Sequence, residues 1–221
     1  MKKIFFFAFV SATGFMSAQT TKKLGDFDEV KVFDQITVEL IHSTENKAEI
    51  TGKRSGDVEF INKNGQLKIR MKLPKLLKGE DIDVKLYYTD LNSVDVSEGA
   101  SITGGKTFAQ TEMSITAKEG GQIRLSLDVS KANVKSVTGG IIKLSGKATN
   151  LDASLGTGGI LEAETLLTVQ TKVGINAGGE ADVNASELVD ANVKAGGTVT
   201  IYGRPKQINK KTTLGGTIEE R

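Results

Sequence analysis

The chain of 221 residues contains no cysteine, which excludes a disulfide framework, a thiolate metal site and the acylated N-terminal cysteine of a bacterial lipoprotein. Its 29 lysines and arginines nearly balance its 27 aspartates and glutamates, so it lacks the cationic surplus with which a nucleic-acid-binding protein displaces counterions from phosphates. His42 is the only histidine in the sequence. We therefore expect no nucleic-acid partner, no metal site and no cofactor.

Residues 1–18 have the pattern of a secretory signal peptide. Two lysines precede an uninterrupted apolar run over residues 4–10, and small residues follow up to Ala18. The run is too short to span a bilayer, so we predict cleavage before Gln19, although the larger Met16 leaves open a cut a few residues upstream. The mature chain is then expected to cross the inner membrane without an integral span and to reach the periplasm, the outer surface or the medium.

Residues 19–90 are predicted to form a strand-rich N-terminal part. Apolar and polar residues alternate across 29–41 and 81–88, which is the periodicity of half-buried strands. Residues 58–71 read as two strands joined by Asn64-Gly65, a strong signal for a hairpin turn. Most aromatic residues of the mature chain lie in this part. We expect it to cap one end of the repeat array that follows, where a last coil would otherwise present a free edge.

From residue 99 onward, a pair of small residues recurs at nearly equal spacing. The first members of successive pairs lie 21, 19, 19, 20, 18 and 19 residues apart, which indicates one supersecondary unit repeated along the chain. Between the pairs the residues alternate as in strands, and helical spacing is missing. The pairs are Gly99-Ala100, Gly120-Gly121, Gly139-Gly140, Gly158-Gly159, Gly178-Gly179, Gly196-Gly197 and Gly215-Gly216.

The fixed period decides between two arrangements of these short strands. Antiparallel hairpins and solenoid coils both accommodate them, but only a solenoid requires units of equal length. We predict an all-β fold, a single-stranded parallel β-helix with about 19 residues per coil over residues 91–221, continuous with 19–90 as one domain. Residues 109–201 contain no aromatic ring, which predicts a thin core.

The glycine pairs are interpreted as coil corners. A sharp corner requires a positive φ, or a backbone contact that leaves no room for a Cβ atom. Phosphate-binding glycines would instead precede a helix, and no helix is predicted here. Near the C-terminus, Arg204-Pro205 and the basic residues of 206–211 interrupt the pattern before 214–218 resume it, so we expect a terminal loop within a C-terminal cap.

We predict no catalytic, cofactor-binding or metal-binding residue. Acidic residues gather in two places, but they alternate with apolar neighbours and are interpreted as solvent-facing strand positions rather than the paired carboxylates of a glycosidase. Residues 178–182 carry alanine where a calcium-binding nonapeptide repeat requires glycine. The acidic residues considered are Asp26, Asp28, Glu29, Glu80, Asp81 and Asp83.

A small set of side chains could contact a sugar or an anion. Ring stacking would have to use Tyr87, Tyr88 or Tyr202, yet adjacent residues on a strand point to opposite sides, so at least one of the first two should lie in the core. Four cations near the C-terminus could touch anionic glycans or lipid head groups, although a solvated loop is the favoured interpretation. They are Arg204, Lys206, Lys210 and Lys211.

Five segments, in this order and spacing, make the chain resemble a family of bacterial exported proteins, the auto-transporter adhesins with a head GIN domain. The resemblance covers nearly the whole mature chain, and it implies a β-helical domain with an adhesin role, common in Bacteroidetes-type bacteria. The later coils depart from the family pattern because Gly-Gly-X replaces Gly-Ala-Ser. The segments are Phe33-Asp34-Gln35-Ile36-Thr37-Val38, Asn64-Gly65-Gln66-Leu67-Lys68-Ile69, Gly99-Ala100-Ser101-Ile102, the later Gly-Gly pairs, and Ile201-Tyr202-Gly203-Arg204-Pro205.

The favoured function is that of a non-enzymatic, exported adhesion or binding module. It would present the faces of its β-helix to a protein or glycan at the cell envelope. One alternative is a self-assembling structural protein of the envelope, which would form homo-oligomers through the ends and faces of stacked coils. A further alternative is a polysaccharide-active β-helix enzyme.

Overall fold

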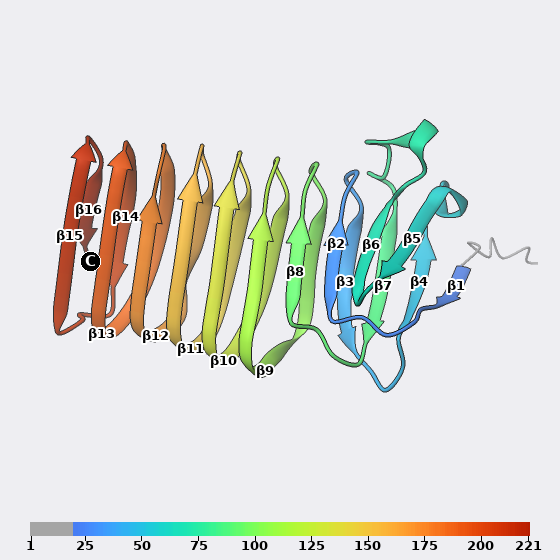
Figure 1. Ribbon diagram of the computed structural model, residues 1–221, viewed down its shortest axis with the longest axis horizontal. Coiled ribbons are helices and arrows are strands. Elements are labelled where there is room, and N and C mark those ends of the chain that lie inside the picture. The colour runs from blue at the N-terminus through green and yellow to red at the C-terminus, as the bar shows by residue number, and fades with distance from the viewer. Residues whose placement is uncertain (1–19) are drawn as a thin grey trace, which may run out of the picture.

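The computed structural model describes residues 20–221, which form a rod built around one continuous sheet of sixteen strands (Figure 1). The rod is a parallel β-solenoid of about seven turns with about 19 residues per turn. This confirms the predicted all-β parallel β-helix and its period. The predicted signal peptide, residues 1–18, lies outside the described residues. Within residues 20–221, no helix has the length and apolarity needed to cross a bilayer.

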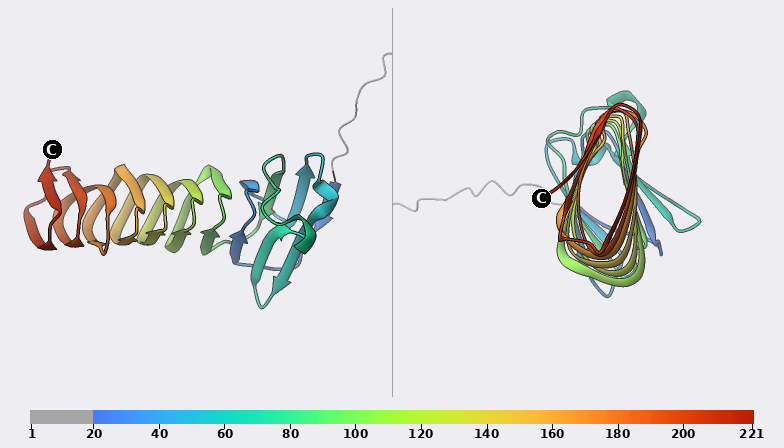
Figure 2. Two further views of the ribbon diagram at one scale, coloured as in Figure 1. Left: turned by 90° about the horizontal axis from the view of Figure 1, so that it is seen from above. Right: turned by 90° about the vertical axis from the view of Figure 1, so that its left-hand side faces the viewer.

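Each regular coil consists of one long strand that bends once and so contributes to two faces. In β10, residues 122–129 pair with the first half of β11 and residues 131–137 pair with its second half, while Ser130 at the bend is unpaired. The end-on view shows the resulting flattened cross-section (Figure 2). The long strands are β9 (Ser101–Ala117), β10 (Gln122–Val137), β11 (Ile141–Gly156), β12 (Ile160–Ile175) and β13 (Gly179–Ala195).

The last coil is divided into shorter strands. Following β13 are β14 (Gly197–Tyr202), β15 (Gln207–Leu214) and β16 (Thr217–Glu220). Of the predicted terminal loop over residues 204–211, residues 204–206 form a loop, but residues 207–211 lie in β15, which pairs in parallel with β13, so this part of the prediction is wrong. Backbone hydrogen bonds hold a strand in the sheet whether or not its solvent-facing side chains are apolar. Lysines on an outer strand also discourage further edge pairing, so a basic run and a strand are compatible here.

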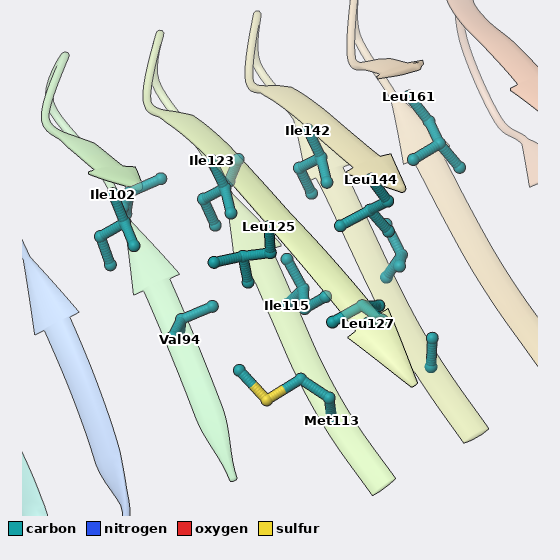
Figure 3. Close-up of a cluster of buried hydrophobic side chains, with 14 of the residues drawn as sticks. Val94, Ile102, Met113, Ile115, Ile123, Leu125, Leu127, Ile142, Leu144 and Leu161 are labelled. Atoms are coloured by element: carbon teal, nitrogen blue, oxygen red, sulfur yellow. The ribbon is translucent and has the colours of Figure 1, made fainter. Parts of the chain in front are cut away.

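The core is a stack of inward-facing aliphatic side chains in register. Ile102, Ile123, Ile142 and Leu161 occupy equivalent positions in successive strands, and all are buried (Figure 3). The alternation of the sequence produces this stack because every second side chain of a strand points to the same side. The two faces lie close together, so from β10 onward the interior accommodates Val, Ile, Leu and Ala rather than rings, as the missing aromatics predicted.

The glycine pairs form the corners opposite the bend. In the turn 156–159, the Gly159 amide donates to the Gly156 carbonyl over 3.2 Å, and Thr157 and Gly158 both have positive φ, as in a type I′ turn. The two glycines have different roles. Gly158 supplies the left-handed backbone, whereas a Cβ atom at Gly159 would overlap the carbonyl oxygen of Ser136 in the preceding coil. The positive φ and the lack of room for a Cβ atom, both expected from the sequence, thus occur together in one turn.

The N-terminal strands extend the same stack but in a different spatial order. Strands β2 and β3 form a coil that pairs with β8 and β9 on one side and with β6 and β7 on the other. Antiparallel strands β1, β4 and β5 stand at the outer edge, and β5 pairs with β6 through the predicted Asn64-Gly65 hairpin. The bounds are β1 (Thr20–Lys23), β2 (Glu29–Val32), β3 (Thr37–His42), β4 (Lys47–Thr51), β5 (Val58–Lys63), β6 (Gln66–Met71), β7 (Asp83–Tyr88) and β8 (Ser93–Val96), with short 3-10 helices η1 (Ser55–Asp57) and η2 (Leu73–Lys75).

Candidate functional site

The second face of the solenoid, formed by the halves of the strands after the bend, carries outward polar side chains in straight rows. Parallel pairing places the same position of each coil above its neighbour, about 4.8 Å apart. One row is Asn133, Asp152, Lys172, Asp190 and Asn209. A second row is Lys131, Asn150, Gln170, Leu188 and Gln207.

A shallow groove of about 440 Å³ lies between these two rows. It offers carboxylates, amides and ammonium groups in alternation, so donors and acceptors are both available and no single sign of charge dominates. Such a surface suits a neutral partner rich in hydroxyl groups better than a polyanion. Its lining includes Lys131, Asn150, Asp152, Gln170, Lys172, Leu188 and Asp190.

Strand β12 interrupts the regular stack where it bends. Its register shifts against both β11 and β13, so residues are added between residue 163 and residue 170. The extra length places Leu167 in the outward register of Lys147, where 60% of its surface is exposed. Val169 lies at the bend itself, at the position of Thr149 in the preceding coil, and is 38% exposed. The alternation of residues 169–175 predicts that Val169 faces inward with Val173 and Ile175, and its exposure contradicts that prediction. Irregularities of this kind are often found where a sheet presents a binding site.

Hydrogen bonds hold the bulge in β12 in one conformation. The Asn184 side chain donates to the Glu164 carbonyl over 2.8 Å, and the Thr165 hydroxyl donates to the Leu144 carbonyl over 3.3 Å. Inside the coil, the buried hydroxyls of Thr168 and Thr171 lie 2.7 Å apart, and Thr168 donates to the Asn184 carbonyl over 2.7 Å. Leu167 is therefore exposed by a fixed backbone.

A larger groove of about 680 Å³ runs along the bend and includes the bulge. It adjoins the polar rows, because Val169 is followed directly by Gln170. Together, the two grooves place the exposed aliphatic side chains of Leu167 and Val169 beside hydrogen-bonding side chains. A sugar ring or an extended peptide can contact the former with its apolar side and the latter with its polar side. The bend groove is lined by Asp128, Val129, Lys147, Ala148, Thr149, Leu167, Thr168, Val169, Asn184, Ala185, Ser186 and Gly203.

Two of the three tyrosines considered for sugar stacking, Tyr87 and Tyr88, lie away from the grooves. Tyr202 pairs with Asn184 beside the bend groove but is not among the residues that line it. Tyr88 is buried and stacks on Phe108 with 5.6 Å between ring centroids, while His42 packs edge-on against it. Burial raises the pKa of Tyr88 to about 12. Tyr87 points outward, and its hydroxyl donates to Glu49 over 3.1 Å. The prediction that one of the adjacent tyrosines belongs to the core is confirmed.

The acidic residues of the N-terminal part are engaged in local interactions. Glu29 accepts a hydrogen bond from Gln66 over 2.9 Å and lies 3.2 Å from the Lys31 ammonium. Burial alone would raise the pKa of Glu29, but the hydrogen bonds from Gln66 and Lys31 outweigh it and lower that pKa. Glu80 lies 3.5 Å from Arg54. In residues 20–221, no group of three His, Cys, Asp or Glu side chains is arranged to hold a metal ion.

The four C-terminal cations do not gather at the grooves. Lys206 pairs with Glu187 over 2.9 Å, and Lys210 pairs with Glu220 over 2.6 Å.

The bulge in β12 was not predicted from the sequence. Two signals for it exist in the sequence: the unit between Gly158 and Gly178 is 20 residues long, and the adjacent Leu166-Leu167 breaks the alternation.

These features define a class of protein: a β-solenoid that presents a flat polar face and a shallow bend groove. The family model described as "Putative auto-transporter adhesin, head GIN domain" matches residues 26–205, and the chain belongs to this family. The resemblance noted from the sequence is thereby confirmed. A search of curated proteins finds no match.

Solved structures share the fold. A putative adhesin from Bacteroides fragilis NCTC 9343 is similar with a TM-score of 0.85 at 20% identity, and a putative adhesin from Parabacteroides distasonis ATCC 8503 with a TM-score of 0.73 at 20% identity. A putative lipid binding protein from the same Parabacteroides strain has a TM-score of 0.71 at 18% identity. In all three, 92% of this chain and 96% of the other are covered. At these identities the similarity concerns the fold alone.

Proposed function

We propose that the protein is an exported, non-enzymatic adhesion module that binds a glycan or protein of the cell envelope through the polar rows and the bulge in β12. The observation that carries the proposal is the fixed exposure of Leu167 beside in-register polar side chains. Membership of an adhesin family supports it. The sequence pattern of residues 1–18 supports export to the periplasm, the outer surface or the medium.

The chemistry of the face favours a glycan with few charges. Carboxylates and ammonium groups alternate along the row from Asp152 through Lys172 to Asp190, so the face attracts neither sign of charge strongly. Hydroxyl groups of a sugar can donate to Asp152 and accept from Lys172, while the aliphatic edge of Leu167 covers the C–H side of a ring.

Replacing Leu167 by serine together with Gln170 by alanine is expected to weaken binding at least about tenfold, because one apolar contact and one hydrogen bond are lost. The measurement is titration of the exported protein against a glycan array and against solubilised envelope fractions. Leu214→Ser is the matched control, since Leu214 is 76% exposed at the far C-terminal end and should be replaceable without effect. Equal binding by both variants, or no binding by the unmodified protein, would contradict the proposed function.

End-to-end self-assembly is a second candidate, and the open last coil favours it. Strands β15 and β16 end the sheet within the described residues, so their outer edges are available for pairing with another copy. Lys206, Lys210 and Lys211 near this edge oppose such pairing. Sedimentation velocity distinguishes the two functions: growth of the sedimentation coefficient with concentration supports assembly, whereas a monomer at high concentration eliminates it.

The enzyme alternative has a direct test. A polysaccharide-active enzyme releases reducing or unsaturated ends from its substrate. Incubation of the protein with a panel of polysaccharides should release neither if the adhesion proposal holds. Release that survives further purification and is lost in a variant of the grooves would replace the adhesion proposal by a catalytic one.

A further inference from the structure

One corner of the solenoid differs from all the others in length. Strands β2 and β3 are joined by a tight turn at Asp34 and Gln35, and the later coils by the glycine turns. Between β6 and β7, the same edge instead carries residues 72–82, which protrude from the N-terminal end of the rod (Figure 1). We name residues 72–78 the leucine loop.

The leucine loop exposes more apolar surface than any other short segment of the described chain. Leu73, Leu76 and Leu77 are 70%, 43% and 55% exposed, and every residue from 72 to 78 is exposed. Half of the large exposed hydrophobic residues described in the chain thus lie in this one loop. Clustering of this kind in a soluble domain marks a contact surface.

The same loop is cationic. Lys72, Lys75 and Lys78 alternate with the leucines, and the loop contains no acidic residue. Lys53 and Arg54 lie on the adjacent turn, where the Arg54 guanidinium donates to the Lys78 carbonyl over 2.8 Å. The mature chain as a whole is balanced, so this excess of positive charge is local. Glu80 and Asp81 offset Arg54, at 3.5 and 3.9 Å, but both lie outside the loop.

A buried carboxylate fixes the base of the loop. Asp34 accepts hydrogen bonds from the Met71 amide over 2.9 Å and from the Leu77 amide over 2.7 Å, and its own carbonyl accepts from the Gly79 amide over 3.0 Å. Leu77 is held at a φ of 57°, which is rare for a bulky side chain. The leucines therefore cannot fold back onto the core without breaking this clamp.

We infer that the leucine loop docks the N-terminal end of the rod onto an anionic lipid surface. Leucines interspersed with lysines on a convex projection match a bilayer interface, where apolar side chains enter the acyl boundary and ammonium groups meet phosphates. A protein partner would more commonly meet a groove, and the grooves described above lie on other residues. Docking at this end leaves the polar rows of the distal coils free. The inference does not depend on the proposed adhesion function.

The test measures binding of the exported protein to two kinds of vesicle. Mass spectrometry first shows that residues 1–18 are absent from the protein used. One contains phosphatidylcholine alone and the other about one third phosphatidylglycerol. We expect co-sedimentation with the anionic vesicles, and a decrease when salt is added. The chain contains no tryptophan, so Leu76→Trp supplies a single fluorophore whose emission should shift to shorter wavelength with anionic vesicles. Leu214→Trp should show no shift.

Two loop variants separate the apolar and ionic contributions. The triple variant Leu73→Ser, Leu76→Ser and Leu77→Asn should reduce vesicle affinity at least about tenfold, as should Lys75→Gln with Lys78→Gln. Leu214→Ser and Leu167→Ser should bind vesicles normally. Unchanged circular dichroism and thermal unfolding show that the loop variants fold.

Three outcomes overturn the inference: no binding to anionic vesicles, equal binding to neutral vesicles, or full binding by the loop variants. None of them affects the adhesion proposal. That proposal fails if the variant of Leu167 and Gln170 retains envelope binding, if the unmodified protein binds no envelope component, or if the protein releases polysaccharide ends through its grooves.

Discussion

Replacement of Asp34 by alanine should lower the free energy of unfolding by about 4 kcal/mol. The buried carboxylate accepts the Met71 and Leu77 amides, and loss of an acceptor for a charge-assisted hydrogen bond costs about 1.5 to 3 kcal/mol each. Alanine must in addition adopt the φ of 60° at this turn, which costs about 1 kcal/mol. The loss is expected in equilibrium urea unfolding followed by circular dichroism.

A graded series identifies the cause of the Asp34 effect. Asn tolerates positive φ and keeps one acceptor oxygen, so Asp34→Asn should lose about half as much stability. Asp90→Ala is the matched control, because Asp90 is exposed with ordinary backbone, and a change below about 0.5 kcal/mol is expected. Losses below about 0.5 kcal/mol in both the Asn and the Ala variant would show that the clamp on residues 71–77 contributes little.

Substitution within a single glycine pair should have two very different effects. Gly159→Ala is expected to cost about 3 kcal/mol or more, because the new methyl group would overlap the Ser136 carbonyl oxygen in the coil below and the rigid stack can relax only by separating its coils. Gly158→Ala meets no atom closer than 4.0 Å and should cost only about 1 kcal/mol, the cost of a left-handed backbone in alanine.

The glycine comparison is made by thermal and urea unfolding of the two variants side by side. Gly120→Ala and Gly121→Ala repeat the comparison two coils earlier. A Cβ atom at Gly120 would meet open space, whereas one at Gly121 would lie 2.8 Å from the Val96 side chain and 2.9 Å from the Lys118 carbonyl oxygen. The same asymmetry should appear there. If the first member of each pair proved the more costly, then conformational strain rather than coil spacing would govern these corners.

The candidate surface was only partly predictable. The alternation of residues 151–155 is enough to assign one side of the strand to the core, so the outward polar row that includes Asp152 follows once the period is known. The exposure of Leu167 does not follow, because a bulge depends on how β12 pairs with both neighbours rather than on its own pattern. Asn184, in the next coil, completes the site: its side chain donates to the Glu164 carbonyl and its own carbonyl accepts from Thr168.

The sequence by itself determined the repeat, the all-β solenoid, the hairpin at Asn64-Gly65 and the corners, because strand alternation and the geometry of glycine act over a few residues. Tertiary structure alone decided the insertion of the β2–β3 coil between β7 and β9, the strand formed by Gln207–Leu214 and the register of β12 that exposes Leu167. In each case the outcome depends on backbone pairing between coils distant in the chain. Such pairing uses amide and carbonyl groups that every residue carries, so it leaves little trace in the identity of the side chains.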